Sequence, residues 1–141
     1  MVFLLDANVL IALLDPAHVH HDPAHAWFAR RDAWATCPMT ENAVLRIVGH
    51  PRYPNTPGTP AAVAPLMASL GTLPGHVFWP DDISLLEAGA LDLTRLLSPG
   101  QVTDTYLLAL ARAHGGKLAT FDRRLVTDAV PNGAQTLHLI N

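Results

Sequence analysis

Hydrophobic and polar positions along the chain alternate between short apolar runs and longer stretches of helical spacing. The run VFLL at 2–5 predicts a short buried strand, and Val9, Leu10, Leu13 and Leu14 predict a helix that ends at Asp15-Pro16. Similar apolar runs predict further strands at 35–38, 76–79, 118–120 and 136–140. Strands separated by helices are typical of a mostly parallel sheet of about four to five strands, covered on both faces.

Capping residues indicate where the intervening helices begin. Asp22-Pro23 predicts a helix to about residue 32, Thr40 predicts one over 41–48, and Thr59-Pro60 predicts another after a proline-rich loop. Leucine spacing predicts a helix over 83–97, which Pro99-Gly100 ends. The last two expected helices are one that Thr103 caps and Gly115-Gly116 ends, and a short one over 123–130.

The composition favours one α/β domain over residues 1–141. Half of the 141 residues are apolar, which is enough for a core without disulfides, and the lone Cys37 has no partner. The apolar start lacks a basic region and carries Asp6 and Asn8, and no other run could span a bilayer. We therefore expect no membrane segment and a cytoplasmic protein. The net charge of -3 gives no global sign of a nucleic-acid partner.

Four acidic residues lie where predicted strands end or helices begin: Asp6, Glu41, Asp104 and Asp122. Carboxylates at such positions converge on the crevice at the carboxyl ends of the strands, where open α/β sheets bind ligands. Each acid taken singly is better explained as a helix cap or as a partner of the helix dipole. Four in equivalent positions make a shared site of hard divalent cations an equally good explanation.

A cluster of carboxylates with few histidines suits Mg²⁺ or Mn²⁺ better than Zn²⁺. One or two such ions can activate water for attack on a phosphodiester, so that no side-chain nucleophile is required. The chain contains no GxSxG, P-loop or HExxH motif, which removes the commonest competing reaction classes.

Three segments, LLDANVLIALLD, TCPMTENAVLRIV and QVTDTYLLALARAHGGKLATFDRRL, resemble the PIN-domain ribonucleases and specifically the VapC-type toxins of bacterial toxin-antitoxin pairs. The resemblance covers nearly the whole chain and implies a three-layer α/β/α PIN domain. Its strongest parts are Asp6 with Asn8, the run TEN at 40–42, Thr103-Asp104 and the run TFD at 120–122.

The resemblance also implies roles for individual residues. Asp6, Glu41, Asp104 and Asp122 would hold Mg²⁺ or Mn²⁺ and carry the catalysis, and the polar supports that orient them would be Asn8, Thr40 and Thr120. The implied activity is a metal-dependent endoribonuclease that cuts loops of cellular RNA, such as tRNA or rRNA, and leaves a 5′-phosphate and a 3′-hydroxyl. A VapB-type antitoxin and a homodimer are the implied partners.

Basic and aromatic residues supply weaker candidates. Four arginines are candidates for RNA phosphates, with a solvated helix face as the plain alternative: Arg46, Arg52, Arg123 and Arg124. The histidine cluster of His18, His20, His21 and His25 is better explained by surface and capping roles than by zinc. The three tryptophans are expected in the core.

Two other functions fit the same acids. A DNA or flap nuclease uses a similar acidic site, although this chain is short for the helical clamps of such enzymes. A non-catalytic binding module could use the acids to dock a partner's arginine. Sequence alone does not name the RNA target, the antitoxin or the number of metal ions.

Overall fold

Five short strands form a fully parallel sheet in a computed structural model that describes all residues from Met1 to Asn141. They occur in the order β3-β2-β1-β4-β5, and every neighbouring pair is parallel. This confirms the predicted α/β fold with a central parallel sheet. The strands are β1 (Val2–Leu5), β2 (Ala33–Thr36), β3 (His76–Phe78), β4 (Lys117–Thr120) and β5 (Leu137–Leu139).

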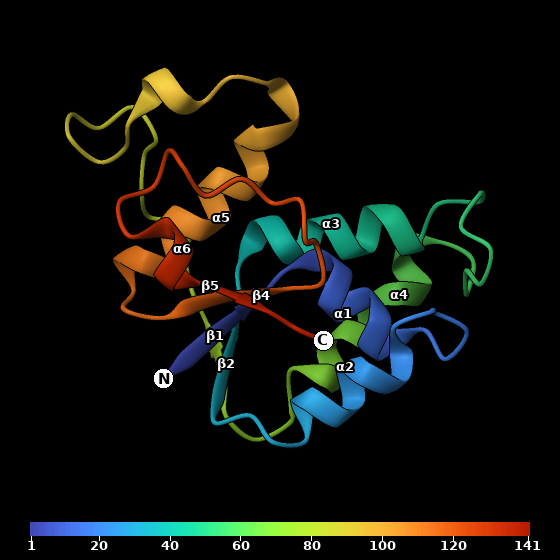
Figure 1. Cartoon of the computed structure of the whole chain (residues 1–141). Coiled ribbons are helices and arrows are strands. Elements are labelled where there is room, and N and C mark those ends of the chain that lie inside the picture. Colours follow the sequence, from blue (N-terminus) through green and yellow to red (C-terminus); the bar gives the residue numbers. More distant parts are fainter.

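Four helices cover one face of the sheet (Figure 1). They are α1 (Ala7–Leu14), α2 (His21–Phe28), α3 (Pro38–Val48) and α4 (Pro60–Leu70). Their apolar side chains pack with Leu5, Trp34 and Ala119 of the sheet into the larger of two cores. Trp34 is fully buried there, as the sequence predicts for this tryptophan.

The opposite face carries α5 (Val102–Ala113), α6 (Gly133–Thr136) and irregular chain (Figure 1). Here Leu4, Ala35 and Leu118 pack against α5 and the buried Trp79 to form the second core. Neighbouring residues of each central strand therefore serve opposite cores, as the twofold alternation of a strand requires. The result is the three-layer arrangement predicted for the chain.

The helix predicted over 83–97 does not form. The segment folds as turns with a single short 3-10 turn at Leu93–Arg95, and Leu86 and Leu97 are more than four-fifths exposed. Gly89 adopts a φ of 79°, and the Asp92 side chain accepts a hydrogen bond from Thr94 N. Both features offer the backbone an alternative to the helix, and they outweigh the leucine spacing.

Several helix boundaries also differ from prediction. Pro38 fixes the first turn of α3, so this helix begins at residue 38 and not after Thr40. Thr103 lies inside α5, which begins at Val102. The helix predicted over 123–130 is a series of turns, in which Asp122 Oδ1 accepts a hydrogen bond from Arg124 N. The α2 helix ends at Phe28, where the Arg31 guanidinium binds the carbonyl oxygen of that residue.

The two strands β1 and β4 determine where a ligand site is expected in the sheet. β1 and β4 lie side by side, with β2 and β3 on one side and β5 on the other. The chain thus leaves β1 in one direction and returns beside it with β4, which makes their carboxyl ends the switch point where open α/β sheets bind ligands. None of the helices is long and apolar enough to cross a membrane.

Candidate active site

Asp6 follows β1 directly and caps α1. Its Oδ1 accepts a hydrogen bond of 2.8 Å from Ala7 N, and its Oδ2 accepts one of 2.8 Å from Thr120 Oγ1. Burial raises the pKa of Asp6, these two hydrogen bonds lower it, and the charge of Asp122 raises it, with a net upward shift. The fold therefore holds a carboxylate at the switch point at an energetic cost, which is typical of functional positions.

Thr120 joins the ends of β1 and β4. Because its hydroxyl has one proton, which goes to Asp6, its oxygen accepts from Asn8 Nδ2 at 3.0 Å and from Asp122 N at 3.1 Å. Asn8 Oδ1 in turn accepts from Phe121 N at 3.2 Å. Asn8 and Thr120 therefore fix the position of Asp6 and of the backbone at Asp122. Their role toward a metal stays a prediction.

Asp104 belongs to the first turn of α5 and is half-buried. Burial raises its pKa to about 6, with further contributions from the charges of Asp6 and Asp122. Three carboxylates from three separate elements therefore act on one another electrostatically. Like charges held this close favour either protonation or a bound cation.

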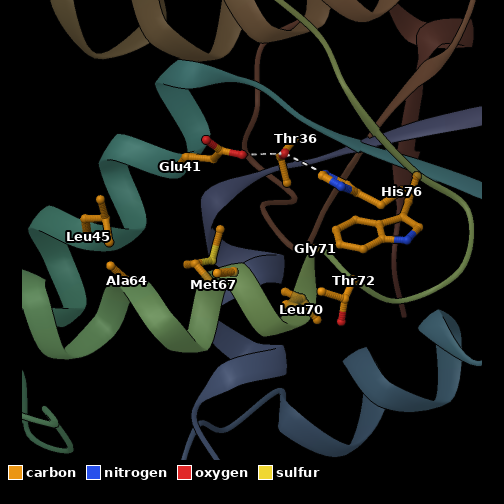
Figure 2. Close-up of a pocket in the computed structure, with 11 residues that line it drawn as sticks. Thr36, Glu41, Leu45, Ala64, Met67, Leu70, Gly71, Thr72 and His76 are labelled. Carbon is orange, nitrogen blue, oxygen red and sulfur yellow. Dashed lines mark hydrogen bonds between the residues drawn. The ribbon is translucent and has the colours of Figure 1, made fainter.

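Glu41 lies on the first turn of α3 and has different partners. Its Oε2 accepts a hydrogen bond of 2.7 Å from Thr36 Oγ1, and the same Thr36 oxygen lies 2.8 Å from His76 Nε2 (Figure 2). A cavity of about 390 Å³ between the sheet, α3 and α4 borders these residues. The charge of Glu41 is not among the causes that raise the pKa of Asp6 or Asp104.

Thr40 bonds to the backbone of Cys37 and not to a carboxylate, and its role toward a metal stays a prediction. Its buried hydroxyl accepts from Cys37 N and donates to Cys37 O, both at 3.1 Å, and so fixes the start of α3. The residue that contacts Glu41 is Thr36, at the end of β2. The sequence could have indicated this contact, because Thr36 is the last residue of β2 just as Thr120 is the last residue of β4. His76 has no such local sign.

No positive side chain neutralises the four predicted acids. The ion pairs of the protein join Arg95 to Asp92 and His114 to Asp82, away from these acids. The donor set is made of carboxylate oxygens, which suits hard divalent cations. No three Asp, Glu, His or Cys side chains are arranged as a ready-made metal site. Asp6, Asp104 and Asp122 are thus uncompensated charges without preformed coordination geometry, and Glu41 stands apart from them with its own partners.

The candidate RNA-binding arginines are all exposed: Arg46, Arg52, Arg123 and Arg124. None of them forms an ion pair, and the Arg123 guanidinium donates a hydrogen bond of 3.4 Å to Asn141 Oδ1. Arg123 and Arg124 follow Asp122 directly, and Arg46 lies on α3 with Glu41. Their contact with phosphate stays a prediction.

The histidine cluster has structural contacts. His21 Nδ1 lies 2.7 Å from Ala12 O, and His25 Nε2 lies 2.8 Å from Leu13 O, so both rings satisfy carbonyl groups at the end of α1. The ring of His20 stacks on Phe121 at 4.5 Å between centroids. These contacts agree with the capping interpretation of the cluster.

Comparison with known proteins identifies the family. The sequence model of the PIN domain matches residues 3–129. The chain is 46% identical over 138 residues to Ribonuclease VapC44 of Mycobacterium tuberculosis, with 96% of each chain covered. It is 43% identical over 131 residues to Ribonuclease VapC39 of the same organism, with 92% of this chain and 94% of the relative covered.

Solved structures show the same fold. The crystal structure of Mycobacterium tuberculosis VapC20, described as a sarcin-ricin loop cleaving toxin, has a TM-score of 0.63 at 18% identity and covers 92% of this chain and 99% of its own. VapBC2 from Rickettsia felis, bound to a DNA fragment from its promoter, has a TM-score of 0.62 at 12% identity over the full length of both chains. The chain therefore belongs to the PIN-domain family, within the VapC group.

Proposed function

We propose that this protein is a metal-dependent endoribonuclease and the toxin of a type II toxin-antitoxin pair. Membership of the VapC group supports a toxin-antitoxin ribonuclease. The observation that carries the metal-dependent reaction is the mutual effect of Asp6, Asp104 and Asp122 at the switch point of the sheet. Three mutually repelling carboxylates with no positive partner suit a divalent cation and an approaching phosphodiester.

The fit to Mg²⁺ or Mn²⁺ rests on the chemistry of the donors. Asp6, Asp104 and Asp122 supply hard oxygen atoms, and Glu41 is the fourth candidate from α3. Because no three side chains are already placed as ligands, cation binding would require some of these carboxylates to change rotamer. Asp6 has the least freedom to do so, since Thr120 and Ala7 N hold both of its oxygens.

The residues of the chain divide the work of hydrolysis. Bound Mg²⁺ or Mn²⁺ supplies Lewis acidity for water activation and offsets the charge that develops on the phosphate. Asp6 provides a fixed carboxylate, while Asp104 and Asp122 complete the negative group. Exposed Arg123 and Arg124 beside Asp122 can hold the phosphates that flank the cut through charge-assisted hydrogen bonds.

The substrate that we propose is a loop of cellular RNA, such as a tRNA or rRNA loop. Unstacked nucleotides expose their backbone, which a duplex does not offer to a cleft of this kind. Cleavage leaves a 5′-phosphate and a 3′-hydroxyl. The uncompensated negative group makes exposed arginines necessary for RNA binding, because the net charge of the protein is -3.

Substitution of Asp6 or Asp104 by asparagine tests this function. Each change removes a charge and retains the shape, so we expect at least about a hundredfold loss of RNA cleavage in Mg²⁺ or Mn²⁺. Asp128→Asn, at an exposed acid, is the matched control and should cut like wild type. Cleavage that persists undiminished in both site variants, or in excess chelator, would refute the proposal. Parallel digestion of single-stranded DNA and flap substrates identifies a DNA nuclease instead.

The partner that we propose is a VapB-type antitoxin. A segment of such a protein would cover the acidic site, with a basic side chain satisfying its uncompensated charge. Co-expression with the neighbouring gene product should suppress cleavage and yield a stable complex. The homodimer implied by the family resemblance can be measured by light scattering of the same samples.

A further inference from the structure

Three polar side chains form one continuous hydrogen-bonded chain at the edge of the sheet. In Figure 2, Glu41 on α3 points toward Thr36, and His76 reaches Thr36 from the other side. Thr36 Oγ1 lies 2.7 Å from Glu41 Oε2 and 2.8 Å from His76 Nε2. Thr36 is only 3% exposed, so its hydroxyl depends on these two partners.

The number of available protons determines which atoms donate and which accept in these two hydrogen bonds. A threonine hydroxyl donates one hydrogen bond, and an ionised carboxylate only accepts. Thr36 therefore donates to Glu41 and must accept from His76, which requires the proton on Nε2. In the opposite arrangement, oxygen lone pairs of Thr36 and Glu41 would face each other at 2.7 Å.

His76 has a packing contact in addition to its hydrogen bond with Thr36. Its ring lies against that of Trp34, with 4.5 Å between centroids, and Trp34 is fully buried. Trp34 Nε1 is itself bound to Pro74 O at 3.2 Å. The cavity of about 390 Å³ borders Glu41, Trp34 and His76 alike. His76 therefore has a ring contact as well as a hydrogen bond, whereas the bond from Thr36 is the side-chain hydrogen bond that orients Glu41.

We propose that His76 is a positioning residue of the ribonuclease, which holds the Glu41 carboxylate in one orientation through the hydroxyl of Thr36. This inference rests on the proposed function, because it assumes that Glu41 takes part in cation binding. Partners that orient ligand carboxylates typically change metal affinity or activity by about 10- to 100-fold when removed.

Matched substitutions separate positioning from folding. His76→Phe keeps the aromatic contact and removes the donor, and Thr36→Val keeps the shape and removes the hydroxyl. We expect each to weaken Mn²⁺ binding, measured by calorimetry, by about tenfold or more, with a similar loss of RNA cleavage. Thr36→Ser and His76→Gln, which retain the hydrogen-bonding groups, should recover most of both. His138→Phe is the control, because His138 is a half-buried histidine on the other edge strand, bound to Trp27.

The double variant and a spectroscopic measurement complete the test. Both residues act on Glu41 through the same pair of hydrogen bonds. The double variant Thr36→Val with His76→Phe should therefore lose no more Mn²⁺ binding or RNA cleavage than Thr36→Val alone. In wild type, the proton on His76 Nε2 should give a protected downfield NMR signal that disappears in Thr36→Val. A proton on Nδ1 alone, additive losses, or normal Mn²⁺ binding in His76→Phe would overturn the inference. Failure of wild type to cut RNA or bind Mn²⁺ would instead refute the proposed function.

Discussion

At the scale of residues, the site has two parts that differ in how well the sequence predicts them. Asp6, Asp104 and Asp122 follow strands or open a helix, and their charges contribute to the raised pKa of Asp6 and of Asp104, while their shared metal site stays a prediction. The partners of Glu41 could not be predicted in this way. The contact with His76 depends on the pairing of β2 with β3, in which Trp34 lies opposite His76, and no local pattern encodes it.

The acidic group should lower the stability of the cation-free protein. Because the pKa of Asp104 is raised to about 6, ionisation of this residue opposes folding, with no penalty well below pH 4 and the full penalty above pH 6. We expect Asp104→Asn to raise the free energy of unfolding at pH 7 by about 1 kcal/mol, a value reduced for partial solvent exposure.

Urea unfolding in chelator measures this effect of Asp104→Asn, with Asp128→Asn as the control. The gain should shrink as the pH is lowered from 7 to 4, while RNA cleavage is lost at every pH. A variant that is less stable than wild type at pH 7 would show that the charge of Asp104 is already compensated in the fold.

At the scale of elements, the strands were predictable, but the helices predicted over 83–97 and 123–130 do not form. Each central strand combines a short apolar run with a turn or helix start on either side, so local sequence defines it. The predicted helix over 83–97 had only leucine spacing in its favour, and Gly89 and Asp92 favour turns. Boundaries of α3 and α5 moved because Pro38 and the turn before Val102 set the first helical residue.

The junction of α3 with α4 gives a prediction at this scale. A Cβ at Gly49 would lie 2.5 Å from Leu45 O and 2.6 Å from Pro60 N, which are backbone atoms that cannot turn aside. We expect Gly49→Ala to destabilise the protein by about 1–3 kcal/mol, since α4 must move away from α3. Gly100→Ala, where nothing lies within 4 Å, should change stability little. Equal unfolding midpoints in urea for the two variants would contradict this expectation.

At the scale of the whole molecule, one buried acid joins distant parts of the chain. Asp15, at the end of α1, is 7% exposed and accepts hydrogen bonds from Tyr53, from Asn55 Nδ2 and from Ala17 N. Burial alone would raise the pKa of Asp15, but these bonds lower it overall. The proline-rich loop that carries Arg52 is thereby fixed to α1, the helix that Asp6 caps.

Removal of this anchor should weaken the protein in a pH-dependent way. Since the pKa of Asp15 is lowered on folding, its contribution is present above the unfolded value of 3.8 and is lost as the pH falls through the folded value. We expect Asp15→Ala to cost about 2 kcal/mol at pH 7, because hydrogen bonds to a charged group are lost. Urea titrations at pH 7 and pH 3 should show the difference from wild type narrowing in acid. A constant difference would assign the loss to packing.

His76 lies on an edge strand, so the part of the site around Glu41 and His76 is less rigid than the part around Asp6 and Thr120. Asp6 follows β1 and Thr120 ends β4, two strands with a neighbour on both sides, whereas β3 has three residues and pairs with β2 alone. Edge strands open more readily to solvent than central ones. A molecule that binds to β3 and distorts it would therefore disturb His76 and Glu41 first. Activity would then fall while Asp6 and Thr120 keep their positions.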